Sequence, residues 1–172
     1  MSVLKESSLP LPLPDFPSPR GLPPTSRVSQ CDAGDISTGD AHLIEAIWGY
    51  GGVPVLASVA LGSDGEYYNV NADQMAAACA IACKANALIF LTDVPGVRGP
   101  DGAVIRWLNA REIPHMAESA VINGGMLPKL EACRQALSNG VGRVRILPAQ
   151  HVEMLPEFYQ ARIDLGTEVM VQ

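Results

Sequence analysis

The stretch Ala87-Leu-Ile-Phe-Leu-Thr92, with Asp93-Val-Pro-Gly-Val97 directly after it, is the strongest structural signal in the sequence. A continuous apolar run of this length, bounded by loop-forming residues, is typical of a strand that is covered on both faces. The alanine-rich segment from Ala72 to Asn86 precedes this run and favours a helix that stops at Asn86. A helix that leads directly into a buried strand indicates an α/β fold with a parallel sheet.

Segments on both sides continue the alternation of helix and strand. Towards the carboxyl terminus, the patterns predict helices over residues 111–118, 127–139 and 152–160 and strands over residues 143–147 and 166–171. Pro114 is expected to interrupt the first of these helices, whereas Pro128 suits the first turn of the second. Towards the amino terminus, the patterns predict a helix over residues 40–48, capped by Asp40, and a buried strand from Val53 to Leu61. The expected architecture is a three-layer αβα sandwich with a mainly parallel central sheet and helices on both faces.

The beginning of the chain differs from the rest. Prolines crowd the segment between Ser8 and Thr25, which has neither a helical nor a strand period. Such a run is extended or disordered and adds little to a core. We therefore expect a proline-rich lead over residues 1–33 and one globular domain over residues 34–172. A solvated tail is favoured for the lead, and a proline-rich ligand for another domain stays open.

Composition and charge limit the classes of function. The net charge of −6 argues against a broad surface for nucleic acid or anionic membranes, but it allows a small anionic ligand at a local positive site. The sequence has no apolar run long enough for a membrane span and no apolar secretory core at its start, so a cytoplasmic location is expected. Cys31, Cys79, Cys83 and Cys133 form no Cys-x-x-Cys pair. Cys79 and Cys83 share one face of a predicted helix, which favours two small buried residues over a metal or redox site.

Two motifs carry most of the chemistry, Asn69-Val-Asn-Ala-Asp73 and Asn123-Gly-Gly-Met-Leu-Pro-Lys129. Each places polar or charged groups beside a predicted helix start, where free backbone N–H groups favour an anion. Together they supply a carboxylate, an ammonium and several carboxamides, a set suited to stabilising a phosphoryl group during transfer. The spacing is not that of a P-loop, in which the lysine follows glycine and precedes Ser or Thr.

Simpler interpretations exist for each of these segments. Asp73 is equally well explained as a helix cap, with Asn69 and Asn71 as turn formers. Lys129 is less readily explained as a solvated lysine at an ordinary loop-to-helix junction. The segment Asp93 to Val97 stands at the carboxyl end of a strand, where α/β proteins gather ligands, but Pro-Gly turn geometry explains it as well.

The same residues resemble the amino acid kinase family, and most closely those members that phosphorylate N-acetylglutamate. The resemblance runs from about Gly34 to Val171. It includes Val53 to Leu56, Tyr68 to Asp73, Leu91 to Val97, Gly124 to Ala132 and Gly166-Thr167. It implies transfer of the ATP γ-phosphoryl group to the side-chain carboxylate of N-acetylglutamate, an early step of arginine synthesis. Mg²⁺ would accompany ATP, held mostly by phosphates and water. An acetylaminoadipate-type acceptor stays open, as does a homo-oligomer.

The resemblance also implies roles for individual residues. Lys129 would neutralise charge on the transferring phosphoryl group, and Asp73 would orient the catalytic lysines of the family. Asn69 would bind the α-carboxylate of the acceptor, and Asn71 belongs to the same substrate-binding segment. The residues implied for the nucleotide pocket are Asp93, Val94, Pro95, Gly96, Val97, Arg98, Val121, Ile122, Asn123, Gly124 and Gly125.

One departure from the family pattern is large. Members of the family begin with a strand that carries a lysine and a Gly-Gly phosphate loop, followed by a second glycine loop and an arginine for the acceptor. The sequence contains none of these, so the resemblance covers only the carboxyl-terminal, nucleotide-binding half. We expect a truncated kinase that binds nucleotide weakly and turns over negligibly by itself. The alternative is a non-catalytic half-kinase that binds nucleotide or docks on a partner.

Overall fold

A computed structural model of the chain describes residues 29–30, 39–119, 122, 124–155 and 165–171. Its elements are β1 (Ser29–Gln30), α1 (His42–Gly49), β2 (Val59–Leu61), β3 (Tyr67–Asn69), α2 (Ala72–Ala82), β4 (Leu88–Thr92), β5 (Trp107–Asn109), α3 (Ile113–Glu118), α4 (Met126–Ser138), β6 (Val144–Pro148), the 3₁₀ helix η1 (Ala149–Met154) and β7 (Thr167–Met170). Across these residues, no helix is both long and apolar enough to cross a bilayer.

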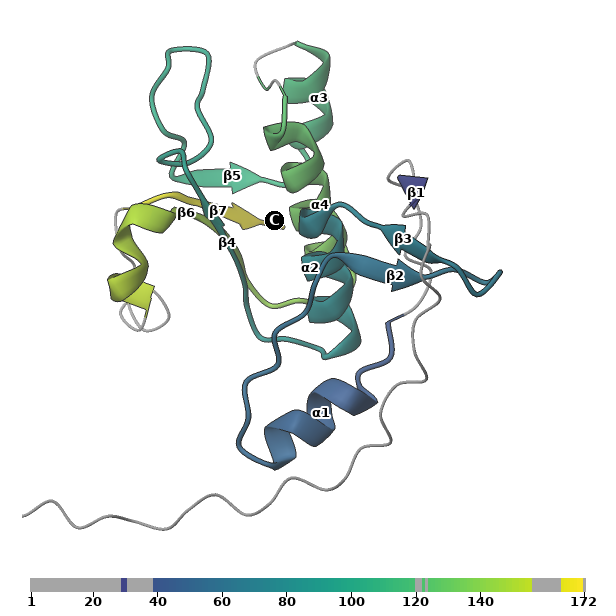
Figure 1. The fold of residues 1–172 in the computed structure, drawn as a ribbon. Helices are drawn as coiled ribbons and strands as arrows, with labels where there is room; N and C mark the ends of the chain where they lie inside the picture. The colour runs from purple at the N-terminus through teal and green to yellow at the C-terminus, as the bar shows by residue number, and fades with distance from the viewer. Residues whose placement is uncertain (1–28, 31–38, 120–121, 123, 156–164, 172) are drawn as a thin grey trace, which may run out of the picture.

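The larger sheet has four strands in the order β4-β6-β7-β5 (Figure 1). Strand β4 is parallel to β6 and β5 is parallel to β7, whereas β6 and β7 run antiparallel. Helices α2 and α4 pack against each other and against β4 and β6, and η1 contacts the same two strands. The α/β class with a mostly parallel sheet is therefore confirmed. A separate three-stranded sheet, β1-β3-β2, was not expected.

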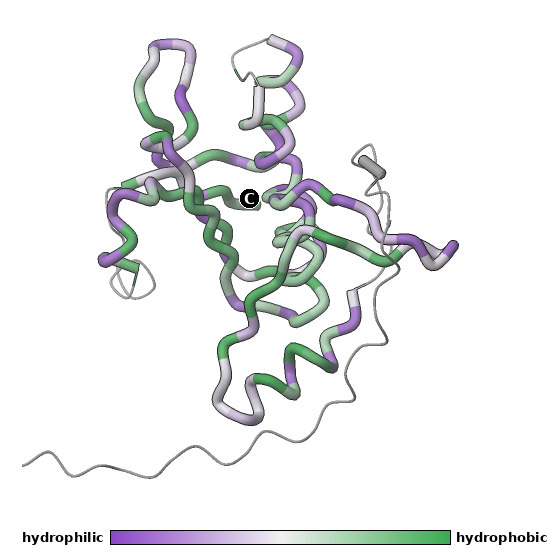
Figure 2. Tube along the Cα trace, viewed as in Figure 1, coloured by the Kyte–Doolittle hydropathy of each residue, from purple (hydrophilic) through white to green (hydrophobic). Residues whose placement is uncertain are grey.

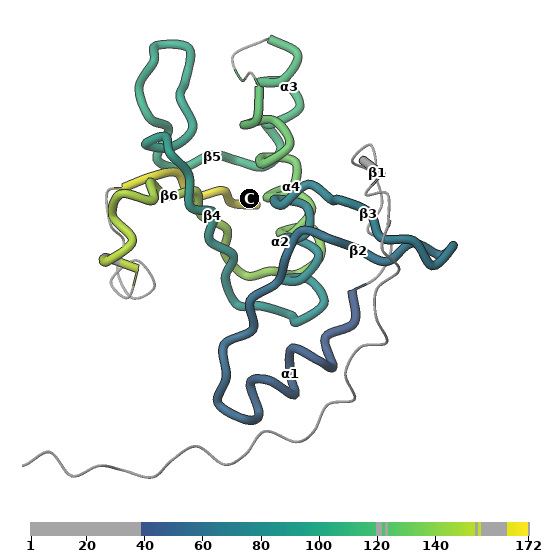
Figure 3. Tube along the Cα trace, in the orientation of Figure 1, coloured from purple at the N-terminus to yellow at the C-terminus, as the bar shows by residue number. Residues whose placement is uncertain are grey.

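The core lies between the larger sheet and the pair of helices α2 and α4. Figure 3 shows these two helices side by side, although β4, β5 and α3 separate them along the chain. Small side chains such as Ala77 and Ala136 face the core and let the helices approach closely. Phe90, Val144 and Ile146 cover them from the sheet. Apolar contacts thus fix the first turns of α2 and α4 relative to β4.

A buried ion pair marks the other face of the same sheet. Arg145 and Glu168 stand opposite each other in the register of β6 and β7, with Arg145 Nε and Nη2 at 2.9 and 2.6 Å from Glu168 Oε2. Arg143 Nε also lies 3.2 Å from Glu168 Oε1. Cross-strand pairs of opposite charge favour one register over its alternatives. These contacts therefore help to hold β7 in place.

Several helix and strand predictions are confirmed, with two corrections at helix ends. Strands β4, β6 and β7 and helices α1 and α4 lie close to their predicted ranges. Pro114 does not interrupt α3 but stands in its first turn, where the missing N–H of proline costs nothing. Helix α2 stops at Ala82 rather than at Asn86, because Lys84 adopts a left-handed backbone with φ 49° and Ala85 N–H turns back to the Ala80 carbonyl at 2.8 Å.

The prediction of a buried strand from Val53 to Leu61 is wrong. Only Val59–Leu61 forms a strand, and Val53 and Val55 are 85% and 95% exposed. Strand β2 pairs with β3 alone, across a turn closed by the Gly65 N–H to Gly62 carbonyl bond, and no described helix covers the preceding residues. The expectation for β4 also fails in part, because Leu91 on the face away from α2 is 42% exposed.

Two strands were not predicted, and two further expectations are tested only in part. Strands β3 and β5 were not predicted, because three-residue strands carry too little period to detect. The helix predicted over residues 152–160 is described only as far as Leu155, and residues 156–164 lie outside the described part. Ser29–Gln30 forms a short strand inside the predicted lead. Residues 31–38 lie outside the described part, so the domain boundary at residue 34 stays a prediction.

Candidate functional site

The structure brings together Asp73 and Lys129, the two charged residues of the predicted motifs. Asp73 stands in the first turn of α2 and Lys129 in the first turn of α4. Lys129 Nζ donates a hydrogen bond to Asp73 Oδ1 in an ion pair whose side chains are only 13% and 20% exposed. The ammonium also lies 4.9 Å from the centre of the Phe90 ring, within range of a cation–π contact. The pair therefore sits over β4.

Asn71 explains why the Asp73 carboxylate is available for this pairing. The Asn71 side chain caps α2, with its Oδ1 accepting from Asp73 N at 2.9 Å and from Gln74 N at 3.3 Å. The interpretation of Asp73 as the cap is therefore replaced by one in which Asn71 caps and Asp73 faces Lys129. Asn69 ends β3, where it is exposed and paired in register with Val59. Substrate binding by Asn69 and Asn71 stays a prediction.

The start of α4 is built from glycine rather than from a capping side chain. Gly124 has φ 62° and Gly125 stands at the N-cap position, where no side chain caps the helix. Both glycines are exposed, and a Cβ on either would meet no atom within 4 Å. Ile122 is buried in the core, so only its backbone is available to a ligand. Val121 and Asn123 lie outside the described residues.

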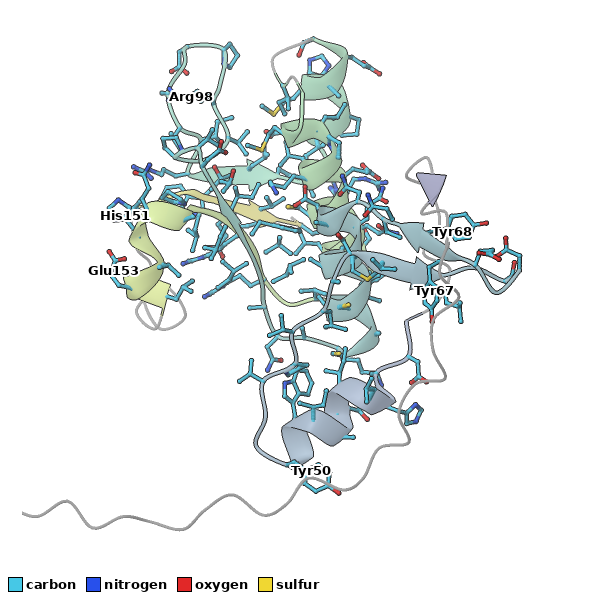
Figure 4. All side chains as sticks on the ribbon, in the orientation of Figure 1. Tyr50, Tyr67, Tyr68, Arg98, His151 and Glu153 are labelled. Carbon is cyan, nitrogen blue, oxygen red and sulfur yellow. The ribbon has the colours of Figure 1, made fainter. Side chains whose placement is uncertain are left out.

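The predicted nucleotide segment, Asp93 to Arg98, leaves the carboxyl end of β4. Asp93, Pro95 and Arg98 are exposed, Val94 is half-buried, and Gly96 and Val97 are buried. Thr92 Oγ1 donates to Asp93 Oδ1 at 3.2 Å, and Arg98 Nη1 donates to the Gly102 carbonyl at 2.8 Å. Figure 4 shows Arg98 on the loop that follows β4. The segment therefore combines an exposed polar rim with a buried anchor.

Sequence reasoning missed two residues that shape the site. Phe90 was assigned only to a strand, yet it lies beneath Lys129. Thr167 accepts a hydrogen bond from Val97 N at 2.9 Å across 70 residues of chain. Neither contact leaves a local pattern, although Gly166-Thr167 does belong to the family resemblance.

The thiol of Cys133 lies near the Lys129–Asp73 ion pair and is unreactive. Cys133 lies one turn after Lys129 on α4 and is buried. Burial raises the pKa of Cys133 to about 12, although the Lys129 charge acts in the opposite direction. Cys133 is therefore a neutral packing residue and is unsuited to nucleophilic chemistry. Cys79 and Cys83, the two cysteines that were predicted to be buried, are only half-buried.

Comparison with known proteins places this geometry in a family. The model of the Amino acid kinase family matches residues 9–148. The chain belongs to the amino acid kinase family. The acetylglutamate kinase of Acidobacterium capsulatum is 62% identical over 137 residues, which are 80% of this chain and 53% of that enzyme. The acetylglutamate kinase of Koribacter versatilis is 50% identical over 137 residues, 80% of this chain and 52% of that enzyme. This amino acid kinase chain thus spans about half the length of the curated relatives it matches.

Solved structures agree on the fold. The structure of smu.665 from Streptococcus mutans matches this amino acid kinase chain with a TM-score of 0.69 and 30% identity, over 81% of this chain and 51% of that one. N-acetylglutamate synthase from Neisseria gonorrhoeae, complexed with coenzyme A and L-arginine, matches with a TM-score of 0.70 and 26% identity, over 81% and 32%. Isopentenyl phosphate kinase from T. acidophilum, at a TM-score of 0.58 and 21% identity over 80% and 56%, shares the fold.

Proposed function

We propose that this chain provides the phosphoryl-transfer side of an acetylglutamate kinase. The reaction moves the ATP γ-phosphoryl group to the side-chain carboxylate of N-acetyl-L-glutamate, in arginine synthesis. The observation that carries the proposal is the Lys129–Asp73 pair, held over Phe90 between two helix starts. The 62% identity to an acetylglutamate kinase supports the choice of acceptor.

Lys129 acts by lowering electrostatic repulsion. The acceptor is a carboxylate, which is already ionised at neutral pH, so the reaction needs no general base. Its barrier comes largely from bringing an anionic acceptor to an anionic donor. An ammonium held in place by Asp73 neutralises the charge of the phosphoryl group without first having to reorganise. Asp73 is thus the positioning residue for Lys129.

The remaining predicted residues surround the two substrates. Asp93 to Arg98, together with Val121 to Gly125, would hold the nucleotide, with the free N–H groups at the start of α4 directed to its phosphates. Asn69 and Asn71 would bind the acceptor. Within the described residues, no three His, Cys, Asp or Glu side chains cluster as metal ligands. Mg²⁺ would be bound through the nucleotide, where it would neutralise phosphate charge.

A second function is nucleotide binding without turnover. The observation that favours it is that the sequence has no strand bearing a lysine and a Gly-Gly phosphate loop. Loss of one preorganised charged donor lowers the rate of an enzyme by roughly 10²-fold or more. The two functions share the nucleotide site and differ only in phosphoryl transfer, so one set of variants tests both.

The test measures thermal stabilisation by ATP–Mg and release of ADP after N-acetylglutamate is added. We expect the unsubstituted chain to be stabilised by ATP–Mg, and Lys129→Ala to lose that stabilisation. Lys84→Ala, at an exposed lysine two residues after the end of α2, is the matched control and should behave like the unsubstituted chain. Turnover that disappears in Lys129→Ala supports the kinase, and stabilisation without turnover supports the binding function. A chain that ATP–Mg does not stabilise contradicts both.

A further inference from the structure

The hydroxyl group of Thr167 forms hydrogen bonds with Val97 and Ile105, the two ends of the hairpin loop that follows β4. Val97 N donates to Thr167 Oγ1 at 2.9 Å, and the same hydroxyl donates to the Ile105 carbonyl at 2.7 Å. Thr167 is 1% exposed, and it is the first residue of β7. One buried hydroxyl thus uses both its donor and its acceptor capacity on a single loop.

Strand directions explain why β7 meets this loop. Strand β4 is parallel to β6, and β6 is antiparallel to β7, so β7 begins at the edge of the sheet where β4 and β6 end. The chain leaves β4 at that edge as Asp93 to Arg98 (Figure 1). The start of β7 is therefore the nearest fixed backbone against which this segment can be held.

The loop approaches β7 too closely for a side chain at Gly96, and the turn into β7 approaches β6 too closely for one at Gly166. Gly96 has φ 148°, and a Cβ there would lie 2.9 Å from Thr167 Oγ1 and 2.8 Å from Val104 Cγ1. A Cβ at Gly166 would lie 2.1 Å from the Ile146 carbonyl oxygen. Glycine is therefore required at position 96 by the contact with β7 and at position 166 by the contact with β6. The close approach is what brings Val97 N within reach of the threonine hydroxyl.

The residues between Val97 and Ile105 form a hairpin whose base is held by Thr167. Ile105 N donates to the Val97 carbonyl at 2.8 Å, and Arg98 and Val104 form a bridge beyond it. Thr167 therefore bonds to both sides of the hairpin at its base, on groups that the hairpin leaves unpaired. The exposed residues before Val97, including Asp93, take their position from this base.

We propose that Thr167 is a positioning residue that holds the segment Asp93 to Arg98 in its nucleotide-binding conformation. The inference rests on the proposed function, because it takes that segment to contact the nucleotide. Without the hydroxyl, the buried Val97 N–H and the Ile105 carbonyl lose their hydrogen-bond partner. Conformations of the loop in which water can bond to these groups then become lower in free energy. Nucleotide affinity falls by the fraction of molecules in which the loop has moved.

The experiment compares Thr167→Val with Thr167→Ser by calorimetric titration with AMP-PNP and Mg²⁺. Thr167→Val keeps the shape but removes the hydroxyl, and we expect about tenfold weaker binding, because the unpaired buried N–H favours conformations in which the loop has moved. Thr167→Ser keeps the hydroxyl and should bind within about twofold of the unsubstituted chain. Amide exchange of Val97 should become faster in Thr167→Val and remain slow in Thr167→Ser.

Two further variants separate positioning from general stability. Val169→Ala removes a buried side chain from the same strand without touching the loop, so it should lower the melting temperature and leave affinity unchanged. Gly96→Ala places a Cβ against Thr167 Oγ1 and should weaken binding even if Thr167→Val does not fold. Equal affinity in Thr167→Val and the unsubstituted chain overturns the inference alone, as does equal weakening by Val169→Ala. An unsubstituted chain that binds no AMP-PNP overturns both this inference and the proposed function.

Discussion

Two regions of this amino acid kinase chain are similarly apolar in sequence but are packed differently. The first, here called the body, comprises the four-stranded sheet with α2, α3 and α4, and the second, the arm, comprises residues 42–61. Figure 2 shows apolar stretches in both regions. In the body, Leu130, Ile146 and Leu147 are fully buried, whereas Val53, Val55 and Tyr50 in the arm are largely exposed. An apolar run therefore becomes a core strand only where a second layer of structure covers it.

The difference in packing between the body and the arm matters for function, because the predicted site residues lie in the body. Asp73, Lys129, the segment Asp93 to Arg98 and Thr167 all belong to the body or leave directly from its strands. Their positions are set by close-packed contacts, which tolerate little movement. The arm contributes Ile44 to buried structure but no partner to these residues in the described part of the chain. Experiments that compare matched changes in the two regions test this division.

The largest difference is expected in cysteine reactivity. Burial raises the pKa of Cys133 to about 12 from 9.0, a change of 3 units, so at pH 8 its thiolate population falls about a thousandfold. Cys83 lies near the arm, and its pKa is raised first by burial and then by Glu45 of α1, but the thiol is only half-buried. Alkylation followed by site-resolved mass spectrometry should modify Cys83 first and Cys133 only on unfolding. Equal rates at the two thiols would show that the body opens readily.

A matched pair of leucines tests packing next. Leu130 in α4 is 0% exposed and Leu43 in α1 is 65% exposed. Leu130→Ala should lower the free energy of unfolding by about 3 kcal/mol, because it leaves a cavity. Leu43→Ala should change it by about 0.5 kcal/mol or less. Urea denaturation measures both, and a large effect of Leu43→Ala would mean that the arm is covered in solution.

Two ion pairs test the electrostatics of the site. Asp73→Asn removes the partner of a largely buried ammonium and should lower the free energy of unfolding by about 2 kcal/mol. Glu131→Gln is the control, because it breaks the half-exposed pair with Arg134, which should be worth about 0.5 kcal/mol or less. Urea denaturation at low and high salt compares the two. Stabilisation by Asp73→Asn would indicate that the pair is held under strain for function.

The smallest effect is expected at the start of the arm. The pKa of His42 is raised above 6.5, first by its side-chain hydrogen bond to Asp40. A raised histidine pKa contributes stability that is fully present below the unfolded pKa and is lost as the pH rises through the folded pKa. Helix α1 should therefore be slightly better ordered at pH 6 than at pH 8, and Asp40→Asn should remove the difference. NMR titration of His42 measures both, and an unshifted pKa would contradict the prediction.

The comparison also explains how far sequence reasoning reached. Strand β4 was predictable from its apolar run. Helix α4 was predictable because Pro128 favours a helix start and Gly140 a helix end, and all of these signals are local. The meeting of Asp73 and Lys129 followed from two helix-start motifs. The Thr167 contact joins residues 70 positions apart, and no local pattern encodes such a bond. The exposure of Val55 depends on what lies against it, which its own apolar character does not determine.

Phe90 has one consequence beyond packing. Its ring covers one side of the Lys129 ammonium, and the Asp73 carboxylate occupies another, so water reaches the charge from few directions. An aromatic ring has no permanent dipole that can reorient, so it screens an electric field much less than water does. The field of the ammonium is therefore directed towards the side that remains open. Because the Asp73 carboxylate cancels much of this field at a distance, an anion meets the positive charge mainly at close range, on the open side of the pair.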